Sequence, residues 1–520
     1  MHWADKIAKE VIDSKKYKPY WVDDMFTPSG YAHIGSLRGP LMHDFMNRAL
    51  KDAEQKTEFT YVFNDFDTID GLPLELSEKF SKYLGFPLRA APSPEPGYES
   101  FAEYFTEDFK KVLADLGVTP RLLSSWDMYH EGKFDGVIKE ALDNGEKIQE
   151  IYQKVSGSAK KEKGWLPFQV ICEKCQKLGT TRVYEWDGKE VSYKCEPNLV
   201  TWAKGCGHEG KISPFGGTGK LPWKVDWPAH WKVMGVTIEG AGKDHASAGG
   251  SYDIAMALCK EVFDYLPPYK FAYEFFLIGG KKMASSKGLG LKARGLTGLL
   301  PASVARFLFA RIDYKQAIEF NPTGTMVIPD LFDEYDRAAE AYWSGSDPDL
   351  DRTFELSQIS GKPPKKMYLP RFRDVVNYLQ QPGVNLAKKF AELKGSALNA
   401  EESEILKERE SYSKIWLENY APKKMKLEMS NDLSDEAKNL SGEQKKYLNS
   451  IIQLIEQEEK PEKLQQSLYE CAKRLKIDTK SAFAAIYLSL IGRVSGPKAA
   501  WFLLSYPKEK VINRLREVSE

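Results

Sequence analysis

The chain has 520 residues, of which 42% are hydrophobic, 12% aromatic and 28% charged. These values are typical of globular proteins and exclude wholesale disorder, and the length predicts about three or four domains. No apolar run reaches the roughly 18–20 residues of a membrane span, and the charged N-terminal stretch lacks the apolar core of a secretory signal. We therefore expect a cytoplasmic protein with no membrane partner.

The formal net charge of zero hides an asymmetry along the chain. Residues 361–520 contain 29 Lys and Arg against 22 Asp and Glu, so this region carries +7 and the preceding residues carry −7. A mildly basic C-terminal region permits a polyanionic partner without requiring one.

The N-terminal part of the chain predicts an α/β domain. Residues 18–25 indicate a strand, residues 27–30 a turn, residues 33–53 a helix with one apolar face, and residues 59–63 a second strand. Strand, helix and strand in this order favour a parallel sheet.

The remaining elements alternate less regularly until helices dominate. Residues 71–100 are rich in Pro and Gly and predict a surface insertion. The later elements are helices over 101–160 with one short strand at 121–125, a cysteine-containing segment at 165–220, a strand at 233–238, a helix at 251–263, a strand at 275–278 and helices from 301 onward. After residue 351 the strand signal almost disappears, which predicts an all-α C-terminal region.

One motif lies between the first predicted strand and the first predicted helix, and it reads Thr27-Pro-Ser-Gly-Tyr-Ala-His-Ile-Gly-Ser36. A helix N-terminus offers unpaired N–H groups and a positive dipole end to anions, and Gly30 and Gly35 let a nucleotide approach the backbone. His33 can donate a hydrogen bond to phosphate oxygens. The alternative is an ordinary helix start capped by Ser29 or Ser36.

A second motif follows the predicted strand at 275–278 and reads Gly279-Gly-Lys-Lys-Met-Ala-Ser-Ser-Lys-Gly288. Glycines at both ends allow this loop to move, while its Lys and Ser side chains can bind phosphates and stabilise the charge on departing pyrophosphate. The alternative is a solvated basic hairpin.

The two motifs, in this order, resemble the HIGH and KMSKS signatures of class I aminoacyl-tRNA synthetases. Four further stretches resemble the class I lysyl-tRNA synthetases within the glutamyl-like subgroup, and these are residues 63–67, 223–227, 239–245 and 273–280. The resemblance covers roughly residues 1–340. The chain departs from the family at Ala284, where Ser is usual, and at Asp24-Met25, where Ser-Gly is usual; the second departure lies near the wall expected for the amino-acid pocket.

The resemblance implies a Rossmann-like catalytic domain over 1–290, with insertions at about 71–165 and a zinc-binding subdomain at about 166–220. A connecting domain at 291–360 and a helical anticodon-binding domain at 361–520 would follow. The implied reaction attaches L-lysine to tRNA(Lys) through lysyl-adenylate and releases AMP and pyrophosphate. ATP, Mg²⁺, L-lysine and tRNA(Lys) are the implied cofactors and partners, and we expect a monomer.

The resemblance also implies roles for individual residues. The catalytic group would be His33, Gly35, Ser36, Lys282, Ser285, Ser286 and Lys287. ATP would be bound by Pro28, Ser29, Gly30, His33, Gly35, Met283 and Lys287. Lysine would be bound by Thr27, Asp65, Trp223, Asp226, His245 and Tyr273, with Asp226 or Asp65 receiving the ε-ammonium and the aromatic residues packing on the alkyl stem.

Four of the six cysteines lie close together in sequence. Cys172 and Cys175 form a Cys-x-x-Cys pair, and Cys195 and Cys206 follow. Zinc takes four such ligands in structural sites, so these four predict a structural Zn²⁺ site, with His208 as an alternative to one cysteine. Isolated reduced thiols are the competing interpretation.

Basic and aromatic residues alternate in parts of the helical tail, notably over 365–373 and 493–510. Such side chains can stack on the bases of a single-stranded RNA loop and hold its phosphates. The alternative is a helical bundle with solvated faces. Alternative functions for the whole chain are a class I synthetase for another amino acid and a non-catalytic tRNA-binding paralogue.

Overall fold

The computed structural model describes residues 1–157, 164–282 and 291–520. Within these residues the chain divides into two compact units, one formed by residues 1–321 and 337–365 and the other by residues 322–336 and 366–520. No described helix is both long and apolar enough to cross a bilayer. The predicted boundaries at 290 and 360 stay predictions.

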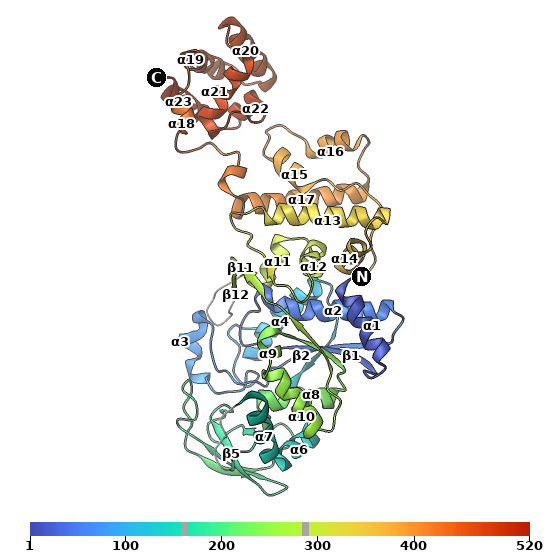
Figure 1. Ribbon diagram of the computed structural model, residues 1–520. Helices are drawn as coiled ribbons and strands as arrows, with labels where there is room; N and C mark the ends of the chain where they lie inside the picture. The colour runs from blue at the N-terminus through green and yellow to red at the C-terminus, as the bar shows by residue number, and fades with distance from the viewer. Residues whose placement is uncertain (158–163, 283–290) are drawn as a thin grey trace. The chain divides into compact units, whose positions relative to one another are not determined.

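The first unit is organised around a five-stranded, wholly parallel sheet (Figure 1). Its strands run in the order β10-β9-β1-β2-β3, which are β10 (Tyr269–Tyr273), β9 (Ile238–Gly242), β1 (Tyr20–Phe26), β2 (Thr57–Phe63) and β3 (Arg121–Ser124). The chain therefore starts with β1 in the middle of the sheet and adds β2 and β3 toward one edge. It then adds β9 and β10 on the other side of β1. This order creates a switch point between β1 and β9, where ligands of open α/β sheets bind.

The predicted Rossmann-like α/β fold is confirmed, with two differences in its strands. The apolar run at 233–238 is not one strand, because α8 (Trp223–Met234) includes its first two residues and Gly235 ends the helix at φ +81°. The predicted strand at 275–278 exists as β11 (Phe276–Ile278), but it belongs to a small separate sheet with β12 (Lys281–Lys282) and β13 (Ile318–Glu319). The edge strand β10 was not predicted.

Helices cover both faces of the sheet. α2 (Arg38–Asp52) packs on β1, β2 and β9, and α1 (Trp3–Ser14) packs on α2. α8 and α10 (Ser251–Glu261) pack together, and Figure 1 shows them on the other side of the strands from α2. The remaining helices of this part are α3 (Ser77–Phe80), α4 (Phe101–Asp115), α5 (Ser125–His130), α6 (Asp135–Asp143), α7 (Gly145–Ser156) and α9 (Lys243–Ala246).

The cysteine-containing insertion is built from short antiparallel strands. β5 (Thr181–Trp186), β6 (Val191–Cys195) and β7 (Glu209–Ile212) form one sheet, and β4 (Gln169–Val170) pairs with β8 (Gly219–Lys220). The Pro/Gly-rich segment at 71–100 has a small core of its own, where Phe80 and Leu88 are buried with Phe101 and Phe105 of α4.

All described elements after β13 are helices, as predicted. α11 (Ala293–Leu299), α12 (Ala302–Ala310), α13 (Val327–Ser344) and α14 (Pro348–Ser357) precede the tail. The tail contains α15 (Phe372–Leu379), α16 (Leu386–Lys394), α17 (Ala400–Asn419), α18 (Asp435–Lys438), α19 (Gly442–Gln457), α20 (Pro461–Arg474), α21 (Thr479–Ile491), α22 (Ala499–Leu504) and α23 (Lys508–Ser519). α18 to α23 share one apolar core, which includes Tyr447, Leu468 and Leu515.

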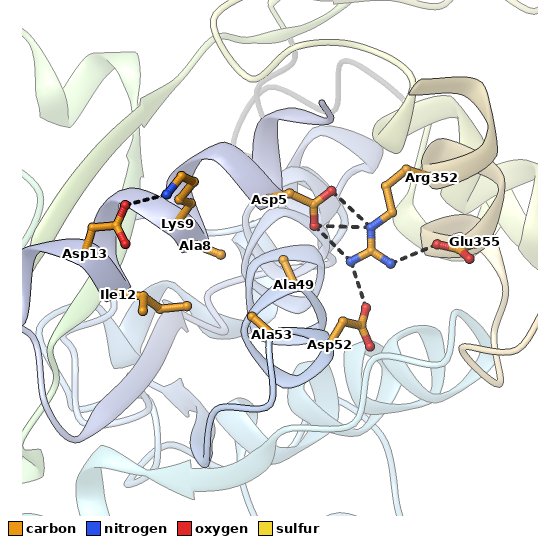
Figure 2. Close-up of a pocket in the computed structure, with 10 residues that line it drawn as sticks. All are labelled: Asp5, Ala8, Lys9, Ile12, Asp13, Ala49, Asp52, Ala53, Arg352 and Glu355. Atoms are coloured by element: carbon orange, nitrogen blue, oxygen red, sulfur yellow. Dashed lines mark hydrogen bonds and ion pairs between the residues drawn. The ribbon is translucent and has the colours of Figure 1, made fainter. Parts of the chain in front are cut away.

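Two arginines join α2 to later helices of the first unit. Arg306 of α12 is fully buried, where its guanidinium donates to Asp44 (2.6 Å) and to the carbonyls of Leu116 and Leu356. Arg352 of α14 binds Asp5, Asp52 and Glu355 at the rim of a surface cavity of about 430 Å³ (Figure 2). Asp5, Asp52 and Glu355 are thus already paired with Arg352. Because these ion pairs connect α1, α2 and α14, we assign the cavity a structural role.

His43 joins α2 to the carboxyl-terminal half of β9. Its Nδ1–H donates to the Gly39 carbonyl (2.8 Å) and its Nε2 accepts from the Gly240 N–H (2.8 Å). Both bonds together require the neutral ring, and burial lowers the pKa of His43 to about 4. Both ring nitrogens of His43 are therefore engaged inside the protein.

We expect Arg306→Met to lower the free energy of unfolding by about 3–5 kcal/mol, because it leaves Asp44 and two buried carbonyls without this donor. Arg352→Met removes a partly solvated cation and should cost about 1 kcal/mol. Urea unfolding followed by tryptophan fluorescence measures both values. Equal losses would contradict the role assigned to Arg306.

We expect acid to destabilise the native protein partly through His43. Its pKa is about 4 in the folded chain and about 6.5 when unfolded, so the unfolded state binds the extra proton between these values and stability is lost as the pH falls. The loss should approach about 2–3 kcal/mol by pH 4.5. His43→Gln should unfold with a correspondingly shallower pH dependence; identical pH profiles for both proteins would refute this.

Candidate active site

A cavity of about 240 Å³ lies at the switch point of the sheet. It is bordered by the ends of β1 and β9, the start of α2, and the beginning of α8. The residues that line it are Asp24, Met25, Phe26, Gly35, Ser36, Gly39, Tyr61, Trp223, Trp227, Glu239, Gly240, Ala241, Gly242, Asp244, His245 and Tyr273. The end of the first motif, Gly35-Ser36, therefore meets β9 and its neighbouring helices here.

The first motif forms a turn and a short 3₁₀ helix before α2. Pro28, Ser29 and Gly30 follow β1 directly, and the Ser29 N–H donates to the Thr27 carbonyl (2.9 Å). The 3₁₀ segment spans Ile34–Leu37, so the α-helix begins five residues later than predicted. The capping side chain is His33, whose Nδ1 accepts from the Ser36 N–H (3.1 Å), and not Ser29 or Ser36 as the alternative interpretation required.

The segments on either side of the lysine-rich loop are bonded to the first motif or to the start of α2. On the exit side, the Ile34 N–H donates to the Leu291 carbonyl (3.0 Å) and the Ala293 N–H to the Ala32 carbonyl (2.7 Å). On the entry side, the guanidinium of Arg38 donates to the Phe275 carbonyl (3.2 Å). Segments about 250 residues apart in the chain therefore converge at one place, as the resemblance implies.

The entry to the loop is a tight hairpin between β11 and β12. Gly279 and Gly280 connect the paired residues Ile278 and Lys281, and both glycines have positive φ, +58° and +71°. A two-residue turn of this kind strongly favours glycine. The Glu319 carboxylate accepts from both glycine N–H groups (2.6 and 2.9 Å) and fixes the turn.

This hairpin places the backbone of Lys282 in β12, paired with Leu277 of β11. The predicted residues Met283, Ser285, Ser286 and Lys287 lie outside the described residues.

Three of the six predicted lysine-binding residues line the cavity, and these are Trp223, His245 and Tyr273. Trp223 stacks on Trp227 with ring centroids 4.9 Å apart, and the His245 ring meets both indoles edge-on. This arrangement forms an aromatic wall suited to an alkyl stem.

The other three predicted residues do not line this cavity, and both predicted acids have partners of their own. Asp65 accepts from Ser124 Oγ (2.7 Å), Ser125 Oγ (3.1 Å) and the Trp126 N–H (2.9 Å). Asp226 accepts from the Tyr129 hydroxyl and is paired with Lys220 at 3.3 Å. The geometry therefore does not bring either carboxylate to the cavity.

Thr27 belongs to a buried polar network instead. Its hydroxyl donates to Asp67 (3.1 Å), and Asp67 accepts from Lys220 Nζ (2.8 Å), which also donates to Asn64 (2.7 Å). Burial alone would lower the pKa of Lys220, but the carboxylates of Asp226 and Asp67 raise it above its usual value. Lys220, the last residue of the cysteine-containing insertion's strands, is thus bonded through Asp67 to the turn of the first motif.

Three acidic residues of the cavity were not assigned a role from sequence, and two of them, Glu239 and Asp24, are buried. Glu239 is buried and accepts from the indole N–H groups of Trp227 (2.8 Å) and Trp231. Asp24 is buried, and its Oδ2 has no hydrogen-bond partner among the described residues. Burial raises the pKa of both carboxyls, and the neighbouring Asp23 raises them further. For Asp24, the sequence feature that could have indicated a role is the pair Asp23-Asp24 inside an otherwise apolar strand.

The four predicted cysteine ligands lie together. The Sγ atoms of Cys172, Cys175, Cys195 and Cys206 all lie within 4.8 Å of one another, and the Cys172–Cys206 and Cys175–Cys195 pairs are each 3.6 Å apart. Thiolates on one tetrahedral Zn²⁺ with 2.3 Å bonds are separated by about 3.8 Å. The predicted alternative ligand His208 is not in this group; its Nε2 lies 3.9 Å from the Glu173 carboxylate.

In the second unit, several basic and aromatic side chains of the tail are engaged internally. Arg371 and Arg373 pair with Asp333, and Phe372 is buried against Phe332 with ring centroids 4.1 Å apart. Lys498 lies over the ring of Trp501 (4.9 Å). The first three of these residues thus support the packing of the unit.

Comparison with known proteins agrees with this arrangement. The family described as "tRNA synthetases class I (K)" matches residues 1–360, and an anticodon binding domain matches residues 376–519. The lysine–tRNA ligase of Archaeoglobus fulgidus is 32% identical over 517 residues, and that of Methanocaldococcus jannaschii is 33% identical over 542 residues; each match covers 99% of this chain and 99% of the relative. The solved glutamate-tRNA synthetase of Elizabethkingia anophelis aligns with 96% of this chain and 99% of its own at 11% identity, with a TM-score of 0.44, which is too low to carry an argument. The chain belongs to the family of class I tRNA synthetases (K).

Proposed function

We propose that this chain is an ATP-dependent lysine–tRNA ligase. The observation that carries the proposal is the convergence of the two motif segments, through the bonds at Ile34, Ala293 and Arg38, beside a cavity at the switch point of a parallel sheet. The carboxylate of lysine would attack the α-phosphate of ATP, forming lysyl-adenylate and releasing pyrophosphate. The terminal ribose of tRNA(Lys) would then take the lysyl group and release AMP.

The residues around the first motif would position ATP. Gly35 and Ser36 border the cavity, and Pro28, Ser29 and Gly30 form the preceding turn, which would hold the nucleotide beside them. His33 would donate to a phosphate oxygen as negative charge develops. Lys282, Met283, Ser285, Ser286 and Lys287 of the loop would close on the phosphates, and Mg²⁺ would accompany ATP.

Lysine would occupy the cavity beside the aromatic wall. Trp223 and Tyr273 would contact its alkyl stem, and His245 would contact it near the cavity mouth, where this histidine is exposed. The helical tail would bind the anticodon region of tRNA(Lys), which the match of residues 376–519 to an anticodon binding domain supports. A cytoplasmic, monomeric enzyme fits this role and stays a prediction.

The four cysteines would hold one structural Zn²⁺. The Sγ distances fit a tetrahedral site, and four protein ligands leave no open position for substrate. The metal would stabilise the β5-β6-β7 sheet, since Cys195 ends β6 and the other three cysteines lie in turns beside it.

His33→Ala should reduce adenylate formation about 100- to 1,000-fold, because it removes a donor from the developing phosphate charge. ATP–pyrophosphate exchange with lysine and tRNA(Lys) present measures this, and the Kd for tRNA should stay within about twofold. His130→Ala, a histidine on α5 whose ring stacks on Trp126, is the matched control with unchanged exchange. Unchanged turnover in His33→Ala removes His33 from the mechanism, and exchange supported only by another amino acid refutes the lysine assignment.

The purified protein should contain one zinc per chain, measured by inductively coupled plasma mass spectrometry. Cys175→Ser should lose this zinc and lower the Tm, because metal binding contributes directly to the folding free energy of such a site. Cys259→Ser is the matched control, since Cys259 is a buried core cysteine of α10 outside the cluster, and it should retain the metal. A wild-type protein that carries no zinc after expression in zinc-supplemented medium would contradict the proposal.

A further inference from the structure

The orphan carboxylate oxygen of Asp24 points to a ligand. Among the described residues, eight buried side-chain atoms lack a hydrogen-bond partner, and Asp24 Oδ2 is the one whose residue lines the switch-point cavity. A buried carboxylate without a donor is expensive, so proteins keep such a group where a ligand supplies the missing charge or hydrogen bond. Asp24 therefore differs from an ordinary buried acid of the core.

Within residues 1–157, 164–282 and 291–520, the surroundings of Asp24 do not supply a counter-charge. His43 Nδ1 lies 3.6 Å from Asp24 Oδ2, but that N–H is used by the Gly39 carbonyl and the ring is neutral. The nearest carboxylate, Asp23, is itself bonded to His230 Nε2 (2.9 Å) and to the Thr60 hydroxyl. Among the described residues, negative charge on Asp24 thus has no counter-charge, and a bound cation would supply one.

The other acids near the cavity are less suited to a cation. Glu239 accepts from two indole N–H groups, and Asp65 and Asp226 are engaged outside the cavity. Asp244 is exposed at the mouth, where water screens its charge. Asp24 is consequently the buried acid of this cavity that keeps one carboxylate oxygen, Oδ2, without a donor among the described residues.

The position of Asp24 fits one end of an amino-acid substrate. Its Oδ2 lies beside Gly39, where a Cβ atom would come within 2.5 Å of it and within 3.1 Å of the Tyr273 hydroxyl, so glycine keeps this space open. Gly39 is four residues beyond Gly35, across the end of the 3₁₀ segment and the start of α2, which is roughly 6–8 Å along the axis. The four-carbon stem of a lysine whose carboxylate lies near Gly35 spans a comparable length.

We propose that Asp24 binds the side-chain ammonium of the amino-acid substrate and thereby selects lysine. This assignment rests on the proposed function and names the specificity-determining residue of that same site. The ammonium pairs with Asp24 Oδ2 at the closed end of the cavity, and Tyr61 and Tyr273 border the charge with aromatic rings. Asp24 on β1 therefore takes the role that the sequence analysis assigned to Asp226 or Asp65.

The test compares lysine with 6-hydroxynorleucine, which replaces the ε-ammonium by an uncharged hydroxyl. Exchange of pyrophosphate into ATP is measured with tRNA(Lys) present, for the wild type, Asp24→Asn and Asp226→Asn. We expect Asp24→Asn to raise the KM for lysine at least about 30-fold, the lower bound for removing one partner of a buried charge pair, with little change in the KM for ATP. Its preference for lysine over the hydroxyl analogue should fall by a similar factor.

Asp226→Asn serves as the rival variant and should keep the wild-type preference for lysine over the analogue. Asn is isosteric with Asp, and Asp24 Oδ2 loses no hydrogen bond, so Asp24→Asn should fold with a Tm close to that of the wild type; Asp24→Ser provides a second variant with the same expected loss of preference. The assignment is wrong if both Asp24 variants keep the full preference for lysine over the hydroxyl analogue. It is also wrong if only Asp226→Asn loses that preference. A wild-type protein that does not activate lysine overturns the proposed function itself, which distinguishes the two failures.

Discussion

The site depends on one constraint, the parallel pairing of β1 with its two neighbours. β1 pairs with β2 over seven residues and with β9 on its other side, and all three strands end at the same edge of the sheet. Because the chain reverses its direction of travel across the sheet at this point, the loops after β1 and β9 diverge and leave a crevice. The first motif follows β1, the two indoles of the aromatic wall precede β9 and His245 follows it, and the segment after the lysine-rich loop bonds with the first motif. The order of the strands in the sheet therefore determines where each functional segment lies.

Much of this arrangement is readable from the sequence because the motifs carry local geometric requirements. The Gly279-Gly280 pair, the Cys-x-x-Cys pair and the turn around Gly30 each indicate a backbone shape that few other residues permit. The four cysteine ligands were predicted as a group and lie together. The all-α tail was predicted from periodicity, and all its described elements are helices.

Long-range pairing explains what sequence reasoning missed. The apolar run at 233–238 crosses a helix end, since Gly235 takes a left-handed conformation inside it, and a window average does not resolve that break. β10 contains Lys270 and lacks β-branched residues, so the neighbouring, more apolar β11 gave the stronger signal. Asp65 and Asp226 are plausible ligands by residue type, but their partners Ser124, Ser125 and Lys220 come from distant segments and could not be foreseen.

Lys220 also determines whether the cysteine-containing insertion can be deleted from the protein. Its ammonium, supplied by the final strand of the cysteine-containing insertion, pairs with the buried Asp226 and the partly exposed Asp67 of the first unit. Excising residues 166–220 would leave both carboxylates without this cation, and the loss at Asp226 is costly because that acid is buried. The insertion is therefore not removable on its own despite its separate sheets. A minimal or chimeric enzyme of this architecture has either to retain this lysine or to replace both acids along with it.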